Sequence, residues 1–441
     1  MKRNGINDLD TWLHRNGRKP LLLFGARQTG KSWLLNEFAT TRFADDHIYL
    51  DLERNGRARQ VFEYDLAPDT LLKRLEQVAG RPIHPGSTLL ILDEIQASNR
   101  ALASLKYFSE EMPRLHLIAA GSLLGIAVRS QGFTMPVGKV DTMTLHPMGF
   151  DEYLEALGEG ALIDEIRACY RDGTAFYLHH DMLEQFWRYL LVGGMPEAVL
   201  TYVETNDLDE VRRRQLDIID LYAADMTKYA TANETARIRD VWRSVPGQLA
   251  KENHKFQYKA IRSGARSSTY ANAISWLLAA GLVNRCVQIT EGRSPIAMHE
   301  NIDAFKIYLH DSGLLAAQSG LTAAMLLDDD NRRMLDLNGI TENHVAQALA
   351  ANGLPLHYWV SSGTAEVDFV IEPTGTITGV PVEVKSSDNT RSRSLNSYID
   401  KYAPSRAIRL STKNFGMEHG ILSMPLYAAF CIEGPVARRQ S

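Results

Sequence analysis

Residues Gly25 to Ser32 have the sequence G-A-R-Q-T-G-K-S, the complete pattern of a phosphate-binding loop. The apolar run Leu21 to Phe24 precedes it and predicts a strand, and the stretch from Trp33 predicts a helix. A loop in this position points the unpaired N–H groups of the helix start at phosphate oxygens. The sequence therefore predicts a nucleoside triphosphate site. Its phosphate-contacting residues are expected to be Gly25, Ala26, Arg27, Gln28, Thr29, Gly30, Lys31 and Ser32.

Two acidic residues close a second predicted strand. Asp93 and Glu94 follow the apolar run 89–92, which is typical of a buried parallel strand, and ligands of such sheets bind at the carboxyl ends of the strands. We expect Lys31 to contact the β- and γ-phosphates, Ser32 and Asp93 to hold Mg²⁺, and Glu94 to deprotonate the attacking water. Alone, the acidic pair would be better explained by a surface turn. Together with the loop at 25–32 it indicates a catalytic site.

A third predicted strand, Leu115 to Ala120, ends in Gly121 and Ser122. The hydroxyl group of Ser122 would then lie beside the γ-phosphate. A simple turn at the end of the strand explains this residue nearly as well.

The order of these motifs resembles that of a family of bacterial and archaeal AAA-type ATPases whose C-terminal half was long catalogued as a domain of unknown function. The resemblance continues through the segments L-H-P-M-G-F-D-E-Y-L (145–154), G-G-M-P-E (193–197) and Y-L-H-D-S-G-L (308–314). It implies ATP hydrolysis with Mg²⁺, a helical lid after the ATPase domain, and a sensor role for Ser122. One difference concerns the arginine finger, because Gly138-Lys139 stands where the resemblance predicts Gly-Arg. Arg129 is the remaining nearby candidate, although a surface arginine is the better interpretation of it.

Length and charge limit the other function classes. The chain has 441 residues, which predicts two or three domains at roughly 150 residues each. Its formal net charge of −5 gives no overall attraction to nucleic acid, so any such contact must use local patches. Three widely separated cysteines predict neither a disulfide framework nor a zinc site and favour the cytoplasm. We expect no signal peptide and no membrane span.

The middle of the chain is predicted to be helical. Apolar residues recur at three- and four-residue spacing between 182 and 191, and Gly193 to Pro196 predicts a turn. The Arg212 to Arg214 triplet lies in a charge-mixed stretch and is interpreted as a solvated helix face. Residues 255–283 predict a helix-turn-helix with its second helix starting at Ser268. A cluster of basic residues lies in and just before this segment, together with a single acid, Glu252. The basic residues are Lys251, Lys255, Lys259, Arg262 and Arg266.

Two interpretations of this helix-turn-helix stay open. In a DNA-binding unit, Ser268, Thr269 and Asn272 would face a major groove. Winged helices also serve as packing or protein-contact modules.

A second chemical signal follows residue 340. The segments T-A-E-V-D-F-V-I (364–371) and V-P-V-E-V-K-S (380–386) alternate like strands, so Glu383 and Lys385 share one face. Asp368 precedes them at a hairpin, and Glu342 opens a predicted helix upstream. This order resembles the core of the PD-(D/E)xK nuclease superfamily, which implies that Glu342, Asp368 and Glu383 bind Mg²⁺ or Mn²⁺ and that Lys385 orients the nucleophile. Glu366 competes with Asp368 as a ligand, and an exposed, solubilising hairpin is the non-functional alternative.

The nuclease site could extend along the residues that follow it. Arg391, Arg393, Tyr398 and Lys401 would line a phosphate track, or form a solvated helix face.

The predicted fold class is α/β. We expect an AAA-type ATPase domain at 1–148, a helical lid or connector at 149–230, a winged helix-turn-helix at 231–305 and a nuclease-like domain at 306–441. The favoured function is ATP hydrolysis coupled to a metal-dependent domain that binds or cleaves DNA. The alternative is a nucleotide-controlled switch whose C-terminal domain binds nucleic acid or protein without cleavage. A protein partner or assembly of several copies is compatible with either function.

Overall fold

The computed structural model describes residues 1–122, 124–127, 136–228, 230–251, 255–361, 365–388 and 393–434. These residues divide into two compact units. The smaller unit comprises Arg3–His146 and Ala279–Gly281, and the larger unit comprises Met1–Lys2, Pro147–Leu278 and Leu282–Ser441. Each unit is described by itself below.

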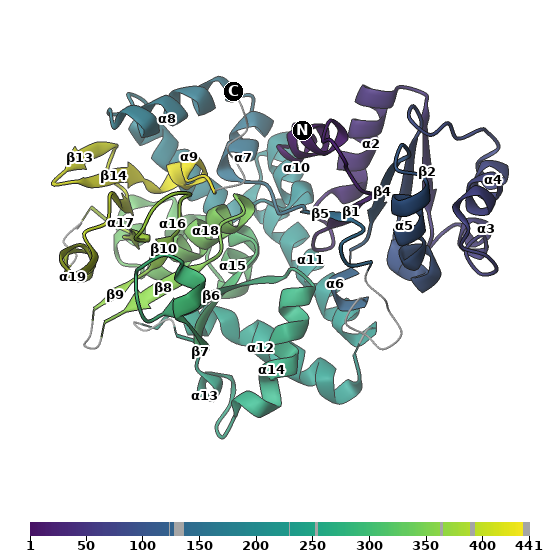
Figure 1. Cartoon of the computed structure of the whole chain (residues 1–441). Helices are drawn as coiled ribbons and strands as arrows, with labels where there is room; N and C mark the ends of the chain where they lie inside the picture. Colours follow the sequence, from purple (N-terminus) through teal and green to yellow (C-terminus); the bar gives the residue numbers. More distant parts are fainter. Residues whose placement is uncertain are drawn as a thin grey trace. The chain divides into compact units, whose positions relative to one another are not determined.

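The smaller unit contains a parallel β-sheet with the strand order β2-β3-β4-β1-β5 (Figure 1, purple to blue). Its strands are β1 (Leu21–Phe24), β2 (His47–Asp51), β3 (Leu89–Asp93), β4 (His116–Ala120) and β5 (Asp141–Thr144). Its helices are α1 (Gly5–Leu13), α2 (Lys31–Phe43), α3 (Gly56–Gln60), α4 (Pro68–Ala79), α5 (Asn99–Glu111) and α6 (Leu124–Ala127), with a 3-10 turn η1 (Ile95–Ala97).

Strand β3 shows why this sheet needs helices on both faces. Leu90 and Leu92 belong to one buried apolar cluster, whereas Leu89 and Ile91 belong to another. Successive side chains of a strand point to opposite faces, so the continuous apolar run predicts burial on both sides. The polar residue that follows the run, Asp93, lies at the carboxyl end of the strand.

The first part of the larger unit is helical, as the spacing of apolar residues predicts. It contains α7 (Phe150–Ala156), α8 (Ala161–Asp172), α9 (His179–Val192), α10 (Pro196–Thr205), α11 (Leu208–Lys228), α12 (Ala232–Leu249), α13 (Tyr258–Ile261) and α14 (Ser267–Ala279). Gly193, with φ of 71°, ends α9, and Pro196 occupies the first position of α10. These residue types suit those positions because glycine tolerates a positive φ and proline lacks an N–H that the first turn could not use.

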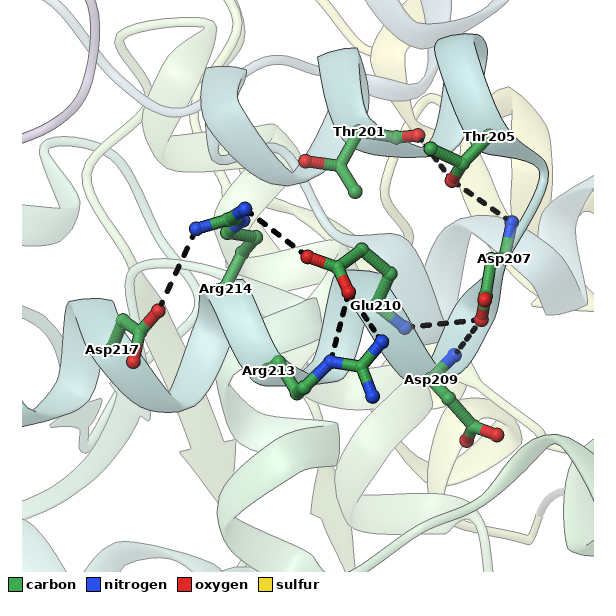
Figure 2. A network of polar contacts seen from close by, with 8 residues as sticks. All are labelled: Thr201, Thr205, Asp207, Asp209, Glu210, Arg213, Arg214 and Asp217. Carbon is green, nitrogen blue, oxygen red and sulfur yellow. Dashed lines mark hydrogen bonds and ion pairs between the residues drawn. The ribbon is translucent and has the colours of Figure 1, made fainter.

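The start of α11 explains the arginine triplet (Figure 2). The carboxylate of Asp207 accepts hydrogen bonds from the backbone N–H groups of Asp209 and Glu210. Glu210 in turn forms ion pairs with Arg213 and Arg214. Arg212 donates to the carbonyl oxygen of Leu321 at 2.8 Å. All three arginines therefore make contacts within the chain, and Arg213 and Arg214 lie on an exposed helix face.

Two further sheets complete the larger unit. One has the order β7-β6-β8-β9 and the other the order β10-β11-β12-β14-β13. The strands are β6 (Val283–Ile289), β7 (Glu300–Leu309), β8 (His357–Val360), β9 (Glu366–Val367), β10 (Phe369–Ile371), β11 (Val380–Val384), β12 (Ala407–Ser411), β13 (Gly416–Glu418) and β14 (Ile421–Pro425). The associated helices are η2 (Ile296–His299), α15 (Ser312–Ser319), α16 (Ala323–Leu326), α17 (Asp329–Arg333), α18 (Asn338–Ala351), α19 (Arg393–Tyr402) and η3 (Leu426–Cys431).

Two details differ from the sequence-based expectations. Helix α18 begins at Asn338, so Glu342 lies one turn inside the helix rather than at its start. The expected domain boundary between residues 305 and 306 falls inside β7, which pairs with β6 over most of its length. An alternating pattern could not reveal this pairing, because β-sheet partners are chosen by tertiary contacts.

Candidate nucleotide site and C-terminal carboxylate cluster

The loop between β1 and α2 has the backbone conformations that its residues predict. Gly25 has φ of 151° and Gly30 has φ of 88°. A Cβ atom on Gly25 would lie 2.6 Å from the carbonyl oxygen of Leu145, so glycine is needed there for space as well as for conformation. The hydroxyl group of Thr29 donates to the carbonyl oxygen of Ala26 at 2.9 Å and holds the loop in a tight turn.

Lys31 lies at the start of α2 and is buried. Its ammonium group donates to the carbonyl oxygens of Gly25 at 2.9 Å and Ala26 at 2.8 Å. Burial lowers the pKa of Lys31 to about 8, although the charges of Glu94 and Asp93 act in the opposite direction. The ammonium group is thus held inside the loop, where a phosphate group would be its natural counter-ion.

Ser32 and Asp93, the two expected Mg²⁺ ligands, are in direct contact. The hydroxyl group of Ser32 donates to Oδ2 of Asp93 at 2.7 Å. The hydroxyl group of Tyr49, on β2, donates to the same oxygen. A hydroxyl oxygen and a carboxylate side by side are hard oxygen ligands, which suit Mg²⁺.

Glu94 turns out of β3 in a left-handed backbone conformation, with φ of 50° and ψ of 45°. One carboxylate oxygen accepts a hydrogen bond from the hydroxyl group of Ser122 at 3.1 Å, and the other accepts one from the side-chain amide of Gln96. The structure therefore brings Ser122 and Glu94 together at the carboxyl ends of β3 and β4. The catalytic roles expected for them stay predictions.

Lys139, which replaces the expected arginine, forms an ion pair with Glu110 at 2.8 Å. Its charge is therefore used within the smaller unit. Arg129 lies outside the described residues.

The C-terminal acids gather around a buried lysine. Lys306, on β7, is fully buried. Its Nζ lies 2.7 Å from Oε1 of Glu366 and 3.5 Å from Oε2 of Glu342. The hydroxyl group of Tyr308, two residues along the same strand, donates to Oε2 of Glu342 at 2.9 Å. Burial alone would lower the pKa of Lys306, but the charges of Glu342, Glu366 and Asp368 raise it, so the side chain is an ammonium ion.

Asp368 lies between β9 and β10, and Glu383 lies on the adjacent strand β11. Oδ2 of Asp368 accepts a hydrogen bond from the backbone N–H of Val384 at 2.8 Å. The ammonium group of Lys385 lies 2.7 Å from Oε1 of Glu383. Burial, followed by the charges of Glu342 and Glu383, raises the pKa of Asp368 well above its ordinary value. The four residues chosen from the sequence, Glu342, Asp368, Glu383 and Lys385, thus interact electrostatically in one cluster.

This cluster does not have the geometry of a metal site. Within the described residues, no three His, Cys, Asp or Glu side chains are placed so that they could share one metal ion. Glu342 is instead paired with Lys306, and Glu383 with Lys385. The residues present therefore do not fit the divalent cation that the sequence pattern predicts.

The basic cluster of the middle segment lies on the surface. Lys259, Arg262 and Arg266 are exposed around α13 and the start of α14. Ser268 and Asn272, on α14, are exposed as well, and Thr269 is half-buried. Lys251 lies 3.2 Å from the side-chain oxygen of Gln257, and Glu252 lies outside the described residues. These side chains are accessible to a partner.

The track of residues predicted after the nuclease motif is not continuous. Tyr398 is buried and donates to the carbonyl oxygens of Gly292 and Gly379. Lys401 pairs with Glu291 at 3.4 Å. Arg393 begins α19, and Arg391 lies outside the described residues. Tyr398 therefore serves the core rather than a phosphate track.

Residues 17–154 match a family described as an AAA domain. This segment covers the phosphate-binding loop, Asp93, Glu94 and Ser122. The smaller unit has the fold of a P-loop AAA ATPase. Residues 183–324 and 338–428 match two families that are each described as a domain of unknown function (DUF8612 and DUF4143).

Solved structures resemble the chain more loosely. A Walker-type ATPase of Pyrococcus abyssi is 16% identical, with a TM-score of 0.45 over 72% of this chain and 95% of that one. The Aeropyrum pernix ORC1 protein, solved with DNA, is 14% identical, with a TM-score of 0.30 over 76% and 93%. DnaA from Aquifex aeolicus, bound to AMPPCP, is 13% identical, with a TM-score of 0.28 over 62% and 86%. No curated protein matches the chain significantly.

Within the part of the chain that the structure describes, no helix has the length and apolar character needed to cross a membrane.

Sequence reasoning missed two residues that contact the AAA site. Arg3 is buried and donates to the carbonyl oxygens of Thr29 at 2.9 Å and His146 at 2.7 Å, which ties the N-terminus to the phosphate-binding loop. Tyr49 reaches Asp93 from a neighbouring strand. No local pattern identifies either residue, because both act over long sequence separations.

Lys306 was also missed. A signal for it existed, since it is the only charged residue in the apolar run 304–309. A charge in such a run predicts burial with a counter-ion.

Proposed function

We propose that this AAA domain binds ATP and hydrolyses it with the help of Mg²⁺. The contact between Ser32 and Asp93 is the main support, because Oγ of Ser32 lies 2.7 Å from Oδ2 of Asp93 and Ser32 directly follows the lysine of the phosphate-binding loop in the sequence. Bound Mg²⁺ would neutralise phosphate charge during transfer.

The side chains of the site suggest a division of labour. When ATP binds, the ammonium group of Lys31 would exchange its two contacts with carbonyl oxygens for contacts with phosphate oxygens. The negative charge of the phosphate would then stabilise the ammonium group. Glu94 would accept the proton of the attacking water through its carboxylate. Ser122, already hydrogen-bonded to Glu94, would contribute a hydroxyl group to the same region.

Two substitutions test this assignment. Lys31→Ala should abolish ATP binding, whereas Glu94→Gln should bind ATP normally and lose hydrolysis by a factor on the order of 10²–10⁴. Fluorescent-nucleotide binding and phosphate release would be measured on the full chain. Glu37→Gln, an exposed substitution on α2, is the matched control. Normal turnover in Glu94→Gln would exclude this residue as the base.

We further propose that the segment 255–283 contacts DNA as a helix-turn-helix, with α14 as its second helix. The support is the exposed basic surface around α13 and α14, since phosphate neutralisation supplies most of the non-specific affinity for DNA. ATP turnover would then act on a DNA-bound chain.

Charge reversal tests the DNA contact. Changing Lys255, Lys259 and Arg262 to glutamate should weaken DNA binding and reduce the dependence of affinity on salt. The control variant changes Arg57, Arg59 and Lys73 to glutamate. These residues are exposed, and the change in net charge is the same. Equal affinities and salt slopes in the two triple variants would assign the segment to packing or to protein contacts.

A second candidate function is DNA cleavage by a nuclease-like C-terminal domain. The element order α18, β8, β9 with β10, β11, α19 and β12 favours it, as does the clustering of Asp368, Glu383 and Lys385. The pairing of Glu342 with Lys306 favours a domain that binds without cutting.

Cleavage can be tested directly. Plasmid and single-stranded DNA would be incubated with the full chain and Mg²⁺ or Mn²⁺, with and without ATP. Cleavage that Asp368→Ala and Lys385→Ala both remove, with ATPase activity retained, would establish a nuclease. If the wild-type chain cuts neither substrate, the nucleotide-controlled switch is the better description.

A further inference from the structure

A positive charge stands inside the C-terminal acidic cluster. Lys306 is fully buried, and its ammonium group faces Glu366 at 2.7 Å and Glu342 at 3.5 Å. The ring of Tyr358 lies on another side, with its centroid 5.0 Å from Nζ. A buried ammonium ion is stable only where its lost hydration is replaced by such partners. The site is thus built to hold a cation.

The strand geometry fixes this arrangement. Lys306 and Tyr308 are two residues apart on β7 and therefore point to the same face. Both engage Oε2 of Glu342, the ammonium group by its charge and the hydroxyl group by a hydrogen bond of 2.9 Å. One carboxylate oxygen of Glu342 is therefore already used by two donors.

The other acids of the cluster have donors of their own. Oδ2 of Asp368 accepts the backbone N–H of Val384, and Oε1 of Glu383 faces the ammonium group of Lys385. A divalent cation would have to displace several of these contacts to reach oxygen ligands at about 2.0–2.6 Å. It would also have to approach the charge of Lys306.

We propose that Lys306 is a built-in counter-ion that takes the place of a divalent cation in the C-terminal carboxylate cluster. This inference rests on the proposed nuclease-like arrangement of the domain and is the alternative to metal-dependent cleavage by it. Part of the negative charge of the cluster is then offset by the chain itself, and the domain folds and acts without a metal ion. Removal of the ammonium group should open a metal site among Glu342, Asp368 and Glu383.

The wild-type chain gives the first test. Binding of Mn²⁺ to the full chain without nucleotide would be measured from the electron paramagnetic resonance signal of free Mn²⁺. Wild-type and Asp368→Asn proteins should give the same binding curve, because the cluster binds no metal in either. Stoichiometric Mn²⁺ binding that Asp368→Asn removes would overturn the proposal.

The second test creates the metal site. Lys306→Met retains an unbranched side chain, one heavy atom shorter than lysine, but removes its charge, and should increase Mn²⁺ affinity on the order of tenfold or more, since a neighbouring positive charge is lost. Its thermal midpoint should fall in EDTA and recover with Mn²⁺. The double variant Lys306→Met with Asp368→Asn should lose both effects.

Lys401→Met is the matched control, because it removes an exposed lysine paired with Glu291 and should behave like wild type. A folded Lys306→Met protein that gains no Mn²⁺ affinity would contradict the proposal. If Lys306→Met cannot be recovered folded, the wild-type comparison decides alone. Neither measurement involves ATP hydrolysis, so the outcome is independent of the ATPase tests.

Discussion

Glu94 combines the side chain expected to act as a base with an unusual backbone conformation. Its φ of 50° places a residue with a side chain in the left-handed region, which costs on the order of 1–3 kcal/mol. The reversal of direction lets the carboxylate meet Ser122 and Gln96 immediately after β3 ends. Such strain at a predicted catalytic position supports a role in function, because folding alone gives no reason to retain it.

Adding one methyl group at Gly25 tests whether the phosphate-binding loop needs glycine at this position. Gly25→Ala should reduce ATP affinity by about tenfold or more, because the added methyl group meets the Leu145 carbonyl oxygen at 2.6 Å and φ of 151° is strained for alanine. Gly56→Ala is the matched control, since nothing lies within 4 Å of its added Cβ. ATP affinity would be measured by calorimetry. Normal affinity in Gly25→Ala would show that the loop can move away from Leu145.

At the scale of elements, the segments 193–197 and 308–314 have a structural role. The end of α9 and the start of α15 approach so closely that a Cβ on Gly313 would lie 2.6 Å from Cα of Gly193 and 2.5 Å from Nε2 of Gln215. Asp311 joins them further, because its carboxylate accepts the backbone N–H groups of Gly194 at 2.5 Å and Leu314 at 2.8 Å. The two segments therefore connect the end of α9 to the start of α15 by close packing and hydrogen bonds.

Gly313→Ala should accordingly destabilise the larger unit by about 1–3 kcal/mol or more, since backbone and buried amide groups must move to admit the methyl group. Gly247→Ala, on the exposed face of α12 with nothing within 4 Å, should instead stabilise it by about 0.5–1 kcal/mol. Urea midpoints of the two variants should move in opposite directions. A neutral Gly313→Ala substitution would mean that the close contact relaxes at little cost.

The elements that sequence analysis predicted best are those with strong local signals. The strand, loop and helix around Gly25 to Ser32 and the buried strand before Asp93 agree with the structure, because turn glycines and continuous apolar runs are local properties. The environment of Glu342 was not predictable in the same way. Its partner Lys306 comes from a strand 36 residues earlier, and only tertiary packing brings them together.

At the scale of the whole molecule, stability should depend on the buried acid that links α9 to α15. Burial raises the pKa of Asp311 from 3.8 to about 6, while hydrogen bonds from the N–H groups of Gly194, Leu314 and Gly313 oppose the shift. The folded chain thus binds this proton more tightly than the unfolded chain. The resulting stabilisation is complete below pH 3.8 and is lost as the pH rises through about 6.

Asp311→Asn removes the titrating carboxyl group. The contribution of this group is therefore the difference between the two proteins in how the free energy of unfolding depends on pH. The wild-type chain should gain about 1 kcal/mol relative to Asp311→Asn between pH 7 and pH 5, which follows from about 1.4 kcal/mol per pH unit for one differential proton. A constant offset is expected as well, because an amide cannot accept both backbone hydrogen bonds. Urea unfolding followed by tryptophan fluorescence at the two pH values measures the difference, and other titrating groups cancel in it. Parallel pH dependence in the two proteins would show that the Asp311 carboxylate is ionised at pH 5 despite its burial.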